Sequence, residues 1–141
     1  MKVRRARRRD FEQVRTLLGA SAPAARAERK RFRRLVSTLR EDIYLAERVQ
    51  DATVVGLAVI AYARGLGPPT AMVRRLLAPS AAAVRLLLDT ACARAAARGC
   101  ARIEVRLDDA GLAATLRETG WTDGPPTLAR NVASEAMGRA S

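Results

Sequence analysis

The sequence contains no histidine, and this absence removes several kinds of chemistry from consideration. Without histidine there is no Ser–His or Cys–His nucleophile pair, and the common zinc sites are excluded as well. The two cysteines, Cys92 and Cys100, lie eight residues apart. We expect a pair of buried, reduced thiols rather than a disulfide. No metal site is expected.

Aromatic residues are scarce, at 4% of the chain, so the core has to be built from Leu, Val and Ala. Long apolar runs are also missing, since the longest uncharged segment, residues 52–63, is too short to span a bilayer. The N-terminal MKVRRARRRDFE is charged but lacks the apolar stretch of a secretory signal. We therefore expect a cytoplasmic protein that does not associate with membranes.

Positive charge, in contrast, is abundant and unevenly placed. The net charge is +12, and residues 1–41 hold 14 of the 26 basic residues but only 4 of the 14 acidic ones. Such a region attracts polyanions such as nucleic acid or an acidic protein. The candidate contacts are Arg4, Arg5, Arg29, Lys30, Arg33 and Arg34. A coding bias toward Arg and Ala explains the same composition without any partner.

Hydrophobic periodicity predicts a mixed chain of helices and strands. The first half is expected to hold a strand over 3–6, a helix over 11–18 capped by Asp10, a helix over 26–40, and strands over 43–49, 54–64 and 70–78. The last three should form an antiparallel meander, because the turns between them are too short for crossovers.

The second half continues with helix, strand, helix and a strand pair. The expected elements are a helix over 80–98 closed by Gly99, a strand over 102–107, a helix after Asp108 or Asp109 that ends at Gly120, and strands over 121–122 and 127–132. The strand over 102–107 should run parallel to the strand before the long helix. Residues 1–132 are expected to form one domain, and 133–141 a frayed tail.

The junction LLAPSAAAVRLLL, residues 76–88, joins an apolar strand to the longest helix. Pro79 ends the strand and Ser80 is the predicted helix cap. The first turn of a helix exposes unpaired N–H groups where an anion can bind. Arg75 and Arg85 flank this opening and could bind a pyrophosphate, although they could equally be solvated surface charges.

Three stretches, VRRARRRDFEQVRTLLG, RLLLDTACARAAARGCARIEV and DAGLAATLRETGW, give the chain a resemblance to the general N-acetyltransferase (GNAT) family over nearly its whole length. The chain also resembles a divergent bacterial subgroup of acetyltransferase-like proteins without an assigned function. The resemblance implies an α+β fold, with a central, mostly antiparallel twisted sheet of about six or seven strands and about four flanking helices.

The resemblance also implies acetyl-CoA as co-substrate and transfer of its acetyl group to an unknown amine. The residues expected to bind the coenzyme are Arg75, Leu76, Leu77, Ser80, Ala81, Ala82, Ala83, Val84 and Arg85. The family's usual motif is altered, since Pro79 stands at its Gln/Arg place and Ala82 and Val84 at its two glycine places. Likewise Asp109, Leu112 and Leu116 stand at the places of its asparagine, alanine and tyrosine.

Two residues are candidates for proton transfer. Tyr62 is the candidate proton donor and Glu47 the candidate base, with Tyr44 and Glu104 as their alternatives. Each of these residues also has a structural explanation. The tyrosines could be half-buried and hydrogen-bonded, and the glutamates could form surface ion pairs. The alternative function is a catalytically degenerate GNAT-fold protein that binds nucleic acid or an acidic partner through its basic N-terminal region. A homodimer is also compatible with the sequence.

Overall fold

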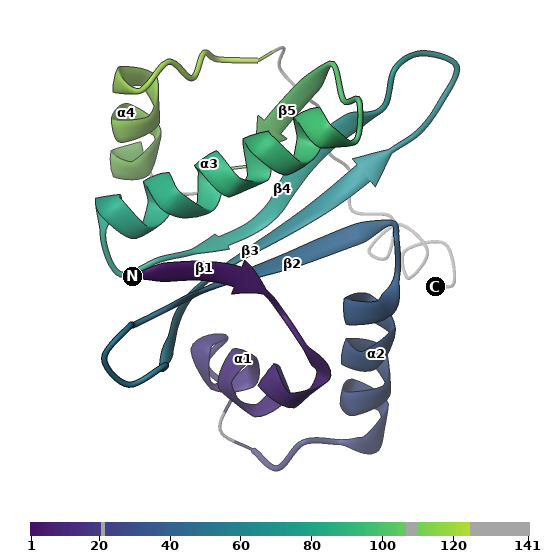
Figure 1. Ribbon diagram of the computed structural model, residues 1–141, viewed down its shortest axis with the longest axis vertical. Helices are drawn as coiled ribbons and strands as arrows, with labels where there is room; N and C mark the ends of the chain where they lie inside the picture. The colour runs from purple at the N-terminus through teal and green to yellow at the C-terminus, as the bar shows by residue number, and fades with distance from the viewer. Residues whose placement is uncertain (21, 107–109, 125–141) are drawn as a thin grey trace, which may run out of the picture. The chain divides into compact units, whose positions relative to one another are not determined.

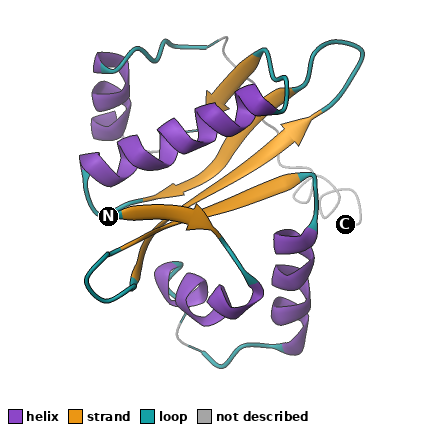
Figure 2. Cartoon of the chain, viewed as in Figure 1, coloured by secondary structure: helices purple, strands orange, loops and turns teal. Residues whose placement is uncertain are grey.

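A computed structural model describes residues 1–20, 22–106 and 110–124 (Figures 1 and 2). The strands are β1 (Lys2–Arg5), β2 (Glu41–Glu47), β3 (Val54–Ala63), β4 (Thr70–Leu77) and β5 (Arg102–Val105). The helices are the 3-10 turn η1 (Arg8–Asp10), α1 (Phe11–Leu17), α2 (Arg26–Ser37), α3 (Ala81–Ala97) and α4 (Ala110–Glu118). The chain divides after Ala110 into two compact units, and each is described by itself.

The first unit is built on one sheet in the order β1-β2-β3-β4-β5. The first four strands are antiparallel neighbours and β5 runs parallel to β4, which confirms the predicted meander and the strand–helix–strand unit. The described residues contain five strands, so the expected six or seven are not confirmed. Residues 121–122 form no strand, and 127–132 lie outside the described ranges.

Helices cover both faces of this sheet because its strands alternate two sets of apolar side chains. One set, with Ile43, Leu45 and Leu57, packs against Val14 of α1 and Phe32 of α2. The other, with Ala46 and Ala58, packs against Leu87 of α3. Figure 1 shows α3 along one face, with α1 and α2 on the other. The small residues on the second face let α3 lie close to the strands.

Gly56 in β3 is where this close approach is tightest. A Cβ atom at this position would lie 3.0 Å from the carbonyl oxygen of Leu77 and 3.3 Å from Cδ1 of Leu87. The missing side chain therefore lets α3 and the end of β4 pack against the same point of β3.

Two predicted helix boundaries differ from the structure. Helix α2 ends at Ser37 rather than at residue 40, because Thr38 is extended and its hydroxyl accepts a hydrogen bond from the Arg40 N–H at 3.2 Å. The prediction that Asp10 caps α1 is wrong. Its carboxylate instead accepts hydrogen bonds from the Arg4 guanidinium and from the Arg7 N–H.

The other local predictions in the first unit concern α3 and the thiols. Ser80 caps α3, and Gly99 follows the helix with φ +76°, both as predicted. Cys92 and Cys100 are free thiols, although they are half-buried rather than fully buried. No helix in the described part of the chain is long and apolar enough to cross a membrane.

The second unit contains α4. The helix ends at Glu118, and the turn after it contains the predicted terminator Gly120, which has φ +96°; the Trp121 N–H then donates to the Leu116 carbonyl at 3.1 Å. The predicted caps, Asp108 and Asp109, lie outside the described residues.

Candidate functional site

A β-bulge interrupts β4 shortly before its end. Val59 of β3 lies opposite Arg75 while Ile60 lies opposite Val73, so Arg74 is the extra residue. Alternation along a regular strand would place Arg74 and Arg75 on opposite faces. With the bulge, both side chains are exposed, whereas Val73 is fully buried. Arg74 pairs with Glu41 at 3.3 Å, and Arg75 has no ion-pair partner among the described residues.

The same segment of β4 separates from β5. Pairing between the two strands runs from Thr70–Arg102 to Val73–Val105, and one further bond joins the Arg106 N–H to the Val73 carbonyl. Beyond it, Arg74–Leu77 pairs only with β3 within the described chain. Because successive N–H groups of a strand point to opposite sides, one of Leu76 and Leu77 directs its N–H toward the side that β5 leaves.

The α3 N-terminus follows directly. Ser80 is extended, its hydroxyl accepts a hydrogen bond from the Ala83 N–H at 3.2 Å, and its carbonyl accepts one from the Val84 N–H at 3.1 Å. Ala81 and Ala82 are exposed, and their N–H groups have no hydrogen-bond partner among the described residues. Two free N–H groups thus face solvent at the positive end of a 17-residue helix.

The alanine-rich sequence leaves this opening accessible. The Val84 side chain, at 7% exposure, is buried in the core, so it does not block the first turn. Arg85 is exposed in that turn. Pro79 precedes the cap, where its missing N–H is not needed. The site lacks the glycines of the GNAT motif but keeps free amides, with Arg85 in the first turn of α3 and Arg75 in β4.

Tyr62 lies away from this junction. It pairs with Ala71, while Leu77 at the end of β4 pairs with Leu57, so Tyr62 lies about 16 Å from that end along the strand. Its hydroxyl donates a 2.6 Å hydrogen bond to Asp42, and the Arg98 guanidinium stacks 4.2 Å from the ring centroid. This geometry favours a structural role for Tyr62.

Asp42 forms a buried charge cluster that the sequence did not reveal. It is fully buried and is bonded by Tyr62 and by three arginines, Arg5, Arg94 and Arg98, at 2.9–3.3 Å. These residues come from β1, β3, α3 and the residue that follows α3, up to 56 positions away in sequence. Local patterns therefore carry no signal for the cluster. It ties the C-terminal half of α3 to the sheet.

We expect Tyr62 to ionise only at a pH above its ordinary pKa of 10.0, because burial and then the hydrogen bond to Asp42 raise the pKa of its hydroxyl. Because the folded state holds the Tyr62 proton more tightly than the unfolded chain, protonated Tyr62 stabilises the folded state fully below pH 10. This contribution to the free energy of unfolding is lost as the pH rises further. Absorbance titration of Tyr44→Phe, which leaves Tyr62 as the only tyrosine, would measure this. Ionisation at or below pH 10 would contradict it.

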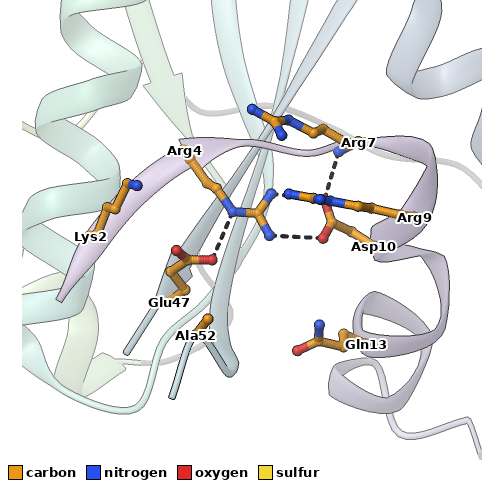
Figure 3. Close-up of a pocket in the computed structure, with 8 residues that line it drawn as sticks. All are labelled: Lys2, Arg4, Arg7, Arg9, Asp10, Gln13, Glu47 and Ala52. Carbon is orange, nitrogen blue, oxygen red and sulfur yellow. Dashed lines mark hydrogen bonds and ion pairs between the residues drawn. The ribbon is translucent and has the colours of Figure 1, made fainter. Parts of the chain in front are cut away.

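Glu47 lies at the same end of the sheet as Leu77, two strands away, which is about 10 Å laterally. Its carboxylate accepts a 2.7 Å hydrogen bond from Nε of Arg4. Figure 3 shows Arg4 between Glu47 and Asp10. Of the alternatives, Glu104 pairs with Arg102 at 3.2 Å. The structure thus brings neither Tyr62 nor Glu47 into contact with the helix opening.

The residues expected to bind polyanions fall into two groups. Arg4 and Arg5 are occupied by the carboxylates of Asp10, Glu47 and Asp42. On α2, Arg29 pairs with Glu12 and stacks on Phe11. Lys30, Arg33 and Arg34 are exposed and have no ion pair within the described residues. The described part of the chain also contains no group of three or more His, Cys, Asp or Glu side chains that could hold a metal ion.

Comparison with known proteins gives matches in structure but not in sequence. No family model and no curated protein matches the chain. An acetyltransferase from Trypanosoma brucei superimposes with a TM-score of 0.77 at 14% identity, covering 93% of this chain and 99% of its own. A proposed acetyltransferase from Agrobacterium tumefaciens gives 0.80 at 15% identity, with the same coverage.

The chain has a GNAT-like fold. A transcriptional regulator from Bacillus halodurans also shares this fold, with a TM-score of 0.77 at 18% identity over 92% of this chain and 98% of its own. At these identities the GNAT-like architecture is established and the activity is not. The function therefore has to be argued from the β4–α3 junction.

Proposed function

We propose that the protein binds acetyl-CoA at the β4–α3 junction and transfers the acetyl group to an amine. The observation that carries this proposal is the pair of free, exposed N–H groups of Ala81 and Ala82 at the opening of α3. A helix start of this kind binds phosphate oxygens through its amides and its dipole. The acetyltransferases that share the fold support the same assignment.

The residues around the junction fit a coenzyme A thioester. The amides of Ala81 and Ala82 would bind the pyrophosphate, and the exposed Arg75 and Arg85 would offer charge-assisted hydrogen bonds to it. The edge of β4 that β5 leaves after Val73 offers a backbone path for the rest of the ligand. The Ser80 hydroxyl already accepts a hydrogen bond from the Ala83 N–H, so the helix start would bind phosphate with two amides rather than three.

When bound, the thioester supplies an activated acetyl carbonyl. The acceptor nitrogen forms a bond to the carbonyl carbon, the carbon–sulfur bond breaks, the amine loses a proton and the thiolate gains one. An N–H of Leu76 or Leu77 would stabilise the negative charge that develops on the carbonyl oxygen. Of the two predicted proton-transfer residues, Glu47 lies nearer the junction and would take the amine proton, directly or through water.

Replacement of Ala82 by aspartate tests this site. A carboxylate in the first turn suits the helix dipole, so the fold should tolerate it, but it should repel the pyrophosphate. We expect Ala82→Asp to weaken acetyl-CoA binding at least about ten-fold, as measured by calorimetry. The matched control is Ala93→Asp, which adds the same charge at an exposed alanine in the middle of α3 and should leave binding unchanged.

Two results would count against the enzyme. No heat with millimolar acetyl-CoA would remove the proposed ligand, and equal weakening by both variants would show that only the overall charge matters. A second function, binding of a polyanion through the unpaired Lys30, Arg33 and Arg34 of α2, would then be favoured. That binding would weaken steeply with salt because counterions are released.

A further inference from the structure

A pocket of about 350 Å³ lies on the α1 side of the sheet; its lining includes Glu47, the base proposed above, but none of the residues proposed to bind the coenzyme. It is bounded by β1, by η1 with the start of α1, and by the turn between β2 and β3 (Figure 3). Its lining is Lys2, Arg4, Arg7, Arg9, Asp10, Gln13, Glu47 and Ala52. The volume is at the lower end of the range of small-molecule sites.

Both carboxylates of this pocket are already satisfied by Arg4. Its guanidinium donates to both oxygens of Asp10, each at 2.8 Å, and to Glu47 at 2.7 Å. The Arg7 N–H adds a fourth bond, to Asp10 at 2.7 Å. The hydrogen bonds from Arg4 hold the pKa of the Asp10 carboxyl below its usual value, so the carboxylate stays ionised at neutral pH. Neither acid needs a further cation.

Three cations remain without such a partner. Lys2, Arg7 and Arg9 are exposed, and their side chains have no ion pair among the described residues. The four basic and two acidic side chains leave the pocket with a net charge of +2. Figure 3 shows the Arg9 side chain next to the Arg4 guanidinium, and the Arg7 side chain above the segment that joins β1 to η1.

Neutral groups at the pocket wall complete the arrangement. Oε1 of Gln13 accepts the Val54 N–H at 3.0 Å, which orients the amide and leaves its NH2 as a donor. Ala52 has φ +57°, a conformation that alanine adopts at a cost, and it lies in the turn that closes the pocket. The pocket thus combines a fixed wall, donor groups and excess positive charge.

We propose that this pocket binds a doubly charged phosphate group, with Arg7, Arg9 and Lys2 as its ligands. A dianion matches the charge excess, and guanidinium groups bind phosphate oxygens through paired hydrogen bonds. The Gln13 amide would add a neutral donor. The site is separate from the start of α3, so a phosphate here and a coenzyme at the junction occupy different places on the protein.

Amide NMR with inorganic phosphate tests this proposal residue by residue. At pH 8 we expect saturable shifts of the Arg7 and Ala52 amide signals, and sodium chloride at equal ionic strength should not reproduce them. The double variant Arg7→Gln/Arg9→Gln should weaken phosphate binding at this pocket at least about ten-fold. Arg26→Gln/Arg31→Gln removes two exposed charges of α2 that lie outside both the pocket and the polyanion surface, and should leave the binding unchanged.

The outcomes separate this pocket from the coenzyme site. Shifts confined to Ala81 and Ala82 would overturn the present proposal while supporting the coenzyme site. Shifts at Arg7 and Ala52 without shifts at Ala81 and Ala82 would support this pocket independently of the coenzyme site. Equal weakening by the two double variants would show that general surface charge attracts the anion, which would also overturn it. Circular dichroism of each variant would show that the fold is retained.

Discussion

Replacement of Asp42 by asparagine should lower the free energy of unfolding by about 3 kcal/mol. The substitution keeps the size of the side chain but removes the carboxylate that Arg5, Arg94 and Arg98 share. Loss of one partner from a buried pair costs about 3–5 kcal/mol, because the remaining charge stays uncompensated. The lower end applies here, since Arg5 and Arg94 reach solvent and only Arg98 is largely buried.

The neighbouring acid provides the control for this prediction. Glu41 pairs with Arg74, whose side chain is 62% exposed, so Glu41→Gln should change stability by no more than about 1 kcal/mol. Urea unfolding of the two variants would measure the difference. A loss below about 1 kcal/mol for Asp42→Asn would mean that the arginines find water or other acceptors without it.

Replacement of Leu87 by alanine should cost about 2–5 kcal/mol of unfolding free energy. Leu87 is completely buried and packs with Ala46 and Ala58 on the α3 face of the sheet. Gly56 leaves no side chain that could move into the vacated space, so the cavity would persist rather than collapse. Alanine is a strong helix former, so the loss would report packing and not helix propensity.

Leu86 is the matched control, because it precedes Leu87 in the same helix and is 40% exposed. Leu86→Ala should cost no more than about 0.5 kcal/mol. Thermal or urea unfolding of both variants would test the pair. Equal losses would contradict the position of α3 relative to β3. Because the start of α3 holds the proposed coenzyme site, we also expect Leu87→Ala to weaken acetyl-CoA binding.

Much of the fold could be predicted from the sequence because its signals are local. Apolar residues alternate over 43–49, as on the buried face of a strand, and recur at helical spacing after Ser80, as on the buried face of a helix. The short turns then imposed the meander. The Asp10 cap was predicted wrongly because the sequence does not show whether an aspartate before a helix caps it or pairs with an arginine, and here Arg4 of β1 reaches this carboxylate.

The candidate site was predictable only in part, for a related physical reason. Ser80 and the helix start follow from the residues that form them, so their positions could be inferred. The bulge at Arg74 depends on the register between β3 and β4, which no local pattern specifies. The four partners of Asp42 are brought together only when α3 docks on the sheet, so their role required the folded structure.

The position and composition of β1 have a consequence for behaviour at high concentration. This strand lies at one border of the sheet, is only four residues long and has the sequence KVRR. A border strand with unpaired backbone groups can recruit a strand from another molecule and start a fibril. Two such copies would here bring together two surfaces that each keep a net positive charge after the ion pairs of Arg4 and Arg5 are counted. Electrostatic repulsion at this border should therefore keep concentrated solutions free of cross-β aggregates, and high salt should weaken that protection.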